Sequence, residues 1–79
     1  MTKEALIKAV GKEIRARRQL KKLTQAGLAL RANVHPNTIS LIERAKTIAG
    51  IDALIDIADA LGASLSQLIK AAEDRIGGR

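Results

Sequence analysis

The only proline of the chain, Pro36, lies between two segments with helical apolar spacing and limits how they can connect. Inside a helix a proline removes a backbone hydrogen bond and clashes with the preceding turn, whereas at the first helical position it costs nothing. Asn33 suits the residue of positive φ that often ends a helix. The pattern therefore predicts a helix that ends near Ala32, a turn from Asn33 to His35, and a new helix that begins at Pro36.

Apolar residues recur at helical spacing along the rest of the chain, and no long stretch alternates as a half-buried strand would. Thr24 is expected to cap the second helix, and Ser64 and Gln67 to form a capping box at the fifth. Gly62 and the pair Gly77-Gly78 are expected to end the last two helices. The predicted helices run from Lys3 to Lys21, Gln25 to Ala32, Pro36 to Glu43 or Arg44, Ile51 to Leu61, and Ser64 to Gly77.

The length and the helical spacing indicate one small all-α domain over residues 1–79. The composition restricts its chemistry. Aromatic residues and cysteines are both absent, so the core must be aliphatic and thiolate chemistry is excluded. The single histidine, His35, cannot form a nucleophile–base pair or a metal site alone, so we expect no catalytic residue, metal or cofactor. No apolar run has the length of a signal peptide or membrane span, which favours a cytoplasmic protein with no membrane partner.

The charge of the chain is concentrated in its first part. Residues 1–46 hold eleven Lys and Arg against three acids, a net charge of +8, whereas residues 47–79 carry −2. This asymmetry is typical of a protein that binds a polyanion, although a solvated Lys/Arg-rich helix face would give the same pattern. Single-stranded nucleic acid is disfavoured because no aromatic side chain can stack on its bases. A membrane role for the basic first helix has little support because its charges are spread widely around the helix.

The helix that begins at Pro36 has two different faces. At 100° per residue, Thr38, Ile39 and Ile42 fall on a core face. An amide can pair with adenine, a hydroxyl can donate or accept, and an aliphatic side chain can meet a thymine methyl, so the opposite face suits a duplex groove. For one residue of that face, Leu41, packing against a neighbouring helix or subunit remains an equal alternative. The outer face consists of Pro36, Asn37, Ser40, Leu41 and Arg44.

Three spaced patterns together resemble the Cro and lambda-repressor-like (XRE-type) helix-turn-helix family over roughly residues 10–70. The resemblance implies a five-helix lambda-repressor-like DNA-binding domain, with the helix-turn-helix at about residues 24–44 and its second helix in the major groove. It also implies a sequence-specific regulator of transcription that binds double-stranded DNA, either a dimeric repressor or a restriction–modification controller-type protein. The patterns are Thr24-Gln25-x-x-Leu28-Ala29, Thr38-Ile39-Ser40-x-Ile42-Glu43-x-x-Lys46, and Leu54-x-x-Ile57-Ala58-x-Ala60-Leu61-Gly62-x-Ser64-Leu65-x-x-Leu68.

The resemblance assigns roles to individual residues. It implies that Arg18 and Glu43 form a partly buried ion pair between the first and third helices. Lys22, Asn33 and Ala45 depart from the family, because they stand where it usually or often has glycine. Base contacts are expected from Pro36, Asn37, Ser40 and Leu41, and DNA-backbone contacts from Gln25, His35, Thr38, Arg44 and Lys46.

The fourth and fifth helices, at about residues 51–76, carry more apolar residues than two helices need to pack on one neighbour. We expect a homodimer surface there, and the alternative is that these residues complete a core without aromatics. A second class of function is an antitoxin or small protein-interaction module whose main partner is a protein such as a toxin, and a polymerase is a further candidate partner. The expected interface residues are Ile48, Ile51, Ile55, Leu65, Ile69, Ala72 and Ile76.

Overall fold

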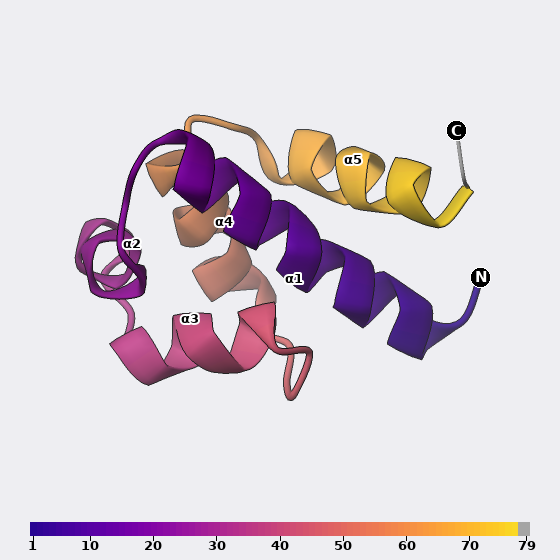
Figure 1. Ribbon diagram of the computed structural model, residues 1–79, viewed down its shortest axis with the longest axis horizontal. Helices are drawn as coiled ribbons and strands as arrows, with labels where there is room; N and C mark the ends of the chain where they lie inside the picture. The colour runs from indigo at the N-terminus through magenta and orange to yellow at the C-terminus, as the bar shows by residue number, and fades with distance from the viewer. Residues whose placement is uncertain (78–79) are drawn as a thin grey trace.

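The computed structural model describes residues 1–77, which form five α-helices and no strand (Figure 1). The first and fourth helices end one residue before the predicted position, and the fifth begins one residue after it, at Leu65. The expectation for Gly78 lies outside the described residues. The predicted all-α class is confirmed. The helices are α1 (Lys3–Leu20), α2 (Gln25–Ala32), α3 (Pro36–Glu43), α4 (Ile51–Ala60) and α5 (Leu65–Gly77).

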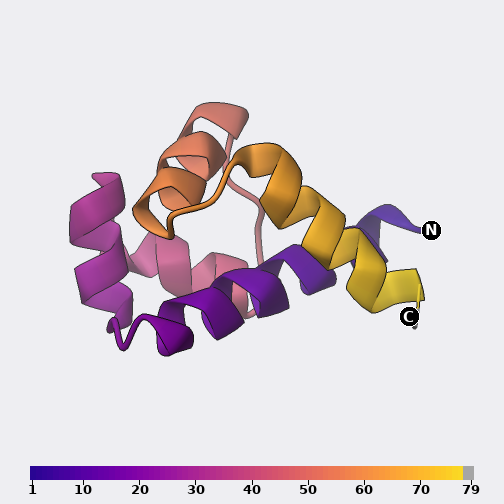
Figure 2. The same cartoon turned by 90° about the horizontal axis from the view of Figure 1, so that it is seen from above.

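The helices surround one aliphatic core. α1 packs against α3 and α5, while α2 packs against α3 and α4, and Figures 1 and 2 both show α5 alongside α1. Burial of apolar side chains is the main force that holds such helices together, since most helical stability in proteins comes from the packing of an apolar face. The largest fully buried side chains are Val10, Ile14, Leu28, Ile39, Ile42, Ile57 and Leu68.

The predicted caps form at the starts of α2 and α5. The hydroxyl of Thr24 accepts a hydrogen bond from the backbone N–H of Gly27 at 2.9 Å. Ser64 and Gln67 exchange two bonds, because Gln67 N–H donates to Ser64 Oγ at 3.1 Å and Ser64 N–H donates to Gln67 Oε1 at 2.9 Å. These side chains satisfy backbone donors that a helix cannot pair internally.

The ends of α1, α2 and α3 share one left-handed backbone geometry. Lys22, Asn33 and Ala45 have φ values of 58°, 57° and 58°. The next residue in each case donates its N–H to a carbonyl five residues earlier, for example Val34 N–H to Ala29 O at 3.0 Å. This is the Schellman motif, in which glycine is favoured because it has no Cβ. This geometry is a physical reason for the glycine that the resemblance implies at these three positions.

Candidate nucleic-acid interface

The turn between α2 and α3 is fixed by bonds at both of its ends. Asn33 ends α2 in the left-handed region, and the half-buried side chain of Val34 packs against the core. His35 is the N-cap of α3, and its Nδ1 accepts the N–H of Asn37 at 3.0 Å. Pro36 occupies the first turn of α3, as predicted. Because Nδ1 accepts this bond, Nε2 is the ring nitrogen that is left to donate to another group.

α3 divides into a core face and an outer face, as the sequence predicted. Ile39 and Ile42 are fully buried, and Thr38 is half-buried. On the outer face Pro36 and Asn37 are exposed. Ser40 and Leu41 in the second half of α3 are half-buried, and Arg44, which follows the helix, is exposed. The outer face is therefore most open at the N-terminal end of α3, which is the end that contacts base edges in helix-turn-helix proteins.

A buried carboxylate holds the C-terminal end of α3 in place. Arg18 Nε donates to Glu43 Oε2 at 2.7 Å, and Arg18 Nη2 donates to Glu43 Oε1 at 3.0 Å, which confirms the ion pair implied by the resemblance. The Glu43 side chain is only 3% exposed. The hydrogen bond to Glu43 raises the pKa of Arg18, although partial burial opposes the shift. Removal of one partner of such a pair typically costs about 3–5 kcal/mol, because the other charge is left buried.

Two further bonds complete this cluster, and sequence reasoning missed both. Arg18 Nη1 donates to the carbonyl of Leu23 at 2.8 Å, and Gln25 Nε2 donates to Glu43 Oε1 at 3.1 Å. Gln25 was expected only as a DNA-backbone contact. One of its two amide N–H groups is committed to Glu43, and the other is free to donate to a phosphate. The cluster joins α1, the turn after it, and the start of α2 to the end of α3.

The remaining predicted backbone contacts lie around the ends of α3. His35, Arg44 and Lys46 are exposed. Arg44 Nε donates to the hydroxyl of Ser40 at 3.3 Å, which orients the guanidinium along the outer face. Within residues 1–77 neither Arg44 nor Lys46 forms an ion pair with a carboxylate. The outer face is thus uncharged from Pro36 to Leu41 and ends in Arg44, and Lys46 follows; the fold neutralises neither of these two cations.

Only some of the residues predicted for the dimer surface are exposed in a single chain. Ile48, Ile51 and Ile55 are exposed, the last two by 69% and 43%. Ala72 is fully buried in the core, so its side chain has no surface left for a second subunit and its assignment to the interface is wrong. Leu65, Ile69 and Ile76 are half-buried against the core of their own chain.

Neither a metal site nor a membrane span is found in the part of the chain that the structure describes. Residues 1–77 contain no cluster of three or more acidic or histidine side chains placed to hold a metal ion. None of the described helices is both long and apolar enough to cross a membrane.

A short helix held from behind by a buried ion pair, with an open face followed by cations, is the arrangement of a helix-turn-helix DNA-binding domain. The helix-turn-helix family matches residues 14–68, more than half of the chain. The chain belongs to this family, in its Cro and lambda-repressor-like branch, and is a DNA-binding transcriptional regulator. A comparison with curated protein sequences finds no match.

Solved structures of regulators have the same fold. The clp gene regulator ClgR from Corynebacterium glutamicum is 29% identical, covers 91% of this chain and 77% of its own, and superposes with a TM-score of 0.85. A variant of the restriction–modification controller protein C.Esp1396I is 28% identical, covers 94% of this chain and 96% of its own, and gives 0.84. The controller protein C.AhdI from Aeromonas hydrophila, at 22% identity with coverages of 78% and 94% and a TM-score of 0.75, shows the fold alone.

Proposed function

We propose that the chain is a sequence-specific regulator that binds duplex DNA as a homodimer and represses or controls transcription. The observation that carries the proposal is the outer face of α3. That face offers the uncharged side chains of Asn37 and Ser40, and it ends in Arg44, with Lys46 just beyond it; neither cation forms an ion pair within residues 1–77. The one carboxylate of α3, Glu43, is buried and paired. The helix can therefore enter the major groove without presenting a negative charge to the phosphates.

Each side chain of the outer face has a definite role in this proposal. Asn37 is exposed and can pair with adenine through two hydrogen bonds, and Ser40 can bond to a base in either direction. Leu41 contributes apolar contact with a thymine methyl. Pro36 has no side-chain donor, so its role is to approach the bases closely rather than to bond to them.

Contacts to the DNA backbone orient the helix in the groove. In the proposal His35 Nε2 and the second N–H of Gln25 donate to phosphates near the N-terminal ends of α3 and α2. The hydroxyl of Thr38 donates to a phosphate. Arg44 and Lys46 bind phosphates beyond the C-terminal end of α3. Such contacts fix register and orientation, whereas the base contacts determine which sequence is preferred.

A second copy of the chain supplies the second half-site. One helix of eight residues makes few base contacts, so high specificity requires two half-sites related by a two-fold axis. Ile48, Ile51 and Ile55 form the exposed part of the proposed dimer surface, and the outer edges of Leu65, Ile69 and Ile76 extend it. The restriction–modification controller proteins and ClgR are regulators of comparable fold, which supports a repressor or controller role in the cytoplasm without catalysis or a cofactor.

The proposal is tested by selecting preferred duplexes from a random pool and then measuring the affinity of Asn37→Ala. Two-fold related half-sites are expected. The substitution should weaken binding to the selected duplex by about 1–3 kcal/mol, which is roughly 5- to 150-fold, because one bidentate base contact is lost. A scrambled duplex of equal length is the control, and its affinity should hardly change. Equal losses on both duplexes would contradict base reading by Asn37.

A further inference from the structure

α1 carries more cations than the fold uses, and ion pairs divide them into two groups. Glu13 accepts from Arg17 Nε at 2.6 Å and from Arg75 Nε of α5 at 2.7 Å. Arg18 is bound to Glu43. These contacts neutralise the cations that point toward the neighbouring helices. The charges of α1 are spread widely around the helix in the sequence, and these ion pairs commit two of them, Arg17 beside α5 and Arg18 beside α3.

The cations that remain in the middle of α1 form one narrow stripe. Lys8, Lys12 and Arg15 are spaced four and three residues apart, which places them next to one another on a helix surface. All three are exposed, and within residues 1–77 none forms an ion pair. We call these three residues the α1 stripe. It spans about 10 Å along the helix at 1.5 Å per residue.

Gly11 shows where this stripe lies relative to α3. A Cβ at Gly11 would overlap the carbonyl oxygen of Ile42 and would lie 3.3 Å from the Cα of Glu43, so the two backbones touch at the C-terminal end of α3. Lys8 and Arg15 lie three residues before and four after Gly11 and therefore flank this contact. The stripe is thus next to the end of α3 that also carries Arg44 and Lys46.

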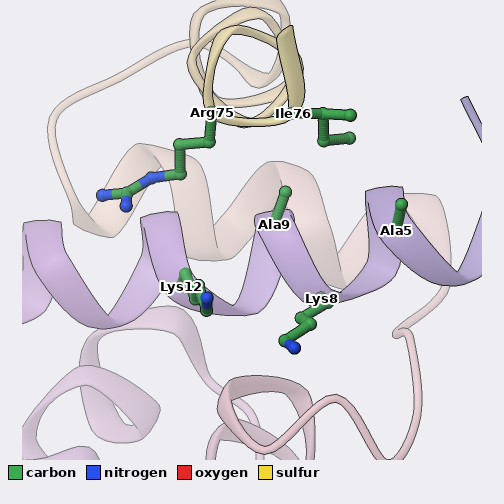
Figure 3. Close-up of a pocket in the computed structure, with 6 residues that line it drawn as sticks. All are labelled: Ala5, Lys8, Ala9, Lys12, Arg75 and Ile76. Atoms are coloured by element: carbon green, nitrogen blue, oxygen red, sulfur yellow. The ribbon is translucent and has the colours of Figure 1, made fainter. Parts of the chain in front are cut away.

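The groove between α1 and α5 gives an independent view of the same side chains. It is lined by Lys8, Lys12, Arg75 and three apolar residues. In Figure 3 the two lysines extend from α1 on the side away from α5, while the Arg75 side chain extends from α5 toward α1. The lysines of the stripe therefore do not serve the contact between α1 and α5.

We propose that Lys8, Lys12 and Arg15 bind the DNA phosphates that border the groove beyond the C-terminal end of α3. This inference rests on the proposed function and adds a second line of backbone contact to it. Three long side chains spaced four and three residues apart can each reach a separate phosphate of one strand. Along the stripe itself there is no large apolar or aromatic anchor of the kind that dominates protein–protein contacts, so a phosphate backbone fits it better than a protein partner.

The test compares two triple variants with equal changes in net charge. One is Lys8→Gln, Lys12→Gln, Arg15→Gln. The control is Lys21→Gln, Arg31→Gln, Lys70→Gln, which removes three exposed cations outside the stripe. Binding to a mixed-sequence duplex of about 30 base pairs is measured over a series of salt concentrations. Loss of three phosphate contacts should lower the slope of log K against log salt by about 2 to 3, whereas the control should lower it much less.

The outcomes separate this inference from the proposed function. Equal slopes for the two variants would overturn the α1 contact, because net charge alone would then explain the effect. An unchanged slope in the stripe variant would also overturn it, and an acidic protein partner would then be the better occupant. If the unaltered chain bound no duplex at any salt concentration, both proposals would fail. Far-ultraviolet circular dichroism of each variant shows whether it is folded.

Discussion

Three residues of this chain adopt a backbone geometry that suits glycine better. Lys22, Asn33 and Ala45 each have φ near 58° at the end of a helix. An L-residue with a Cβ pays roughly 1–2 kcal/mol in this region, and asparagine tolerates it better than the others because its side chain can bond locally. The methyl side chain of Ala45 cannot form such a bond. The end of α3 is therefore a position where the native sequence is not the most stable choice.

We predict that Ala45→Gly stabilises the protein by about 0.5–1 kcal/mol, because relief of the left-handed strain exceeds the entropy that glycine adds to the unfolded chain. The matched control is Ala71→Gly in the middle of α5, where φ is helical and the same change should destabilise by about 1 kcal/mol. Urea unfolding followed by circular dichroism measures both, since the chain has no aromatic fluorophore. Destabilisation by both substitutions would refute the strain argument.

At the scale of the elements, α5 is fastened to α1 by a contact between residues far apart in the sequence. Glu13 accepts hydrogen bonds from Arg17 on its own helix and from Arg75 on α5. Partial burial by itself would raise the pKa of the Glu13 carboxyl, but the hydrogen bonds from Arg75 and Arg17 outweigh it and lower the pKa below its ordinary value of 4.5. The carboxylate form is therefore the one that the folded state favours.

This direction of shift determines the dependence of stability on pH. A folded-state pKa below the unfolded value means that Glu13 contributes stability above about pH 4.5 and that this contribution is lost as the pH falls through the folded value. We predict that Glu13→Gln lowers the free energy of unfolding by about 1 kcal/mol at neutral pH, since its partners are partly exposed. The difference from the unaltered protein should shrink in acid.

Urea unfolding at pH 7 and at about pH 3 provides the measurement. The control is Glu73→Gln on the exposed side of α5, because Glu73 forms no ion pair in the described part of the chain. That substitution should change stability little at either pH. A destabilisation by Glu13→Gln that is just as large in acid would mean that packing of the side chain, and not its charge, is what stabilises the contact.

For the whole molecule, the proposed dimer accounts for apolar surface that one chain leaves exposed. A domain of this size buries only about 60–65% of its unfolded surface, so association adds stability that the core alone does not supply. Ile51 and Ile55 are one turn apart on α4, with 69% and 43% of their surfaces exposed. Repeated on a second chain by a two-fold axis, this patch can pack against itself.

We predict that the unaltered chain sediments as a dimer at tens of micromolar and that Ile51→Lys with Ile55→Lys sediments as a monomer. Two charges on each chain would have to be buried unpaired in the dimer, which is strongly unfavourable. Leu30→Lys is the control, because Leu30 is an exposed leucine on α2 outside the patch. A monomeric unaltered chain would count against the dimer. The patch would be misplaced if the double variant stayed dimeric.

Local bonds explain why so much of the fold was predicted from the sequence. The Thr24 cap, the Ser64–Gln67 box, the left-handed Asn33 and the N-terminal Pro36 all depend on residues at most five positions apart. Their geometry is therefore determined by short stretches of the sequence. The ion pair between Arg18 and Glu43 joins distant residues, and it was anticipated only through the resemblance to a family.

Only the tertiary structure decided how the helices use their remaining side chains. The bond from Gln25 to Glu43, the contact from Arg75 to Glu13, and the complete burial of Ala72 depend on which helix faces meet. The same packing paired Arg17 and Arg18 of α1 and left the α1 stripe unneutralised beside α3. The sequence by itself determined where helices begin and end, because caps and turns act over one turn of backbone. Which cations stay free for DNA was decided by packing, because an ion pair forms only where two helices approach each other.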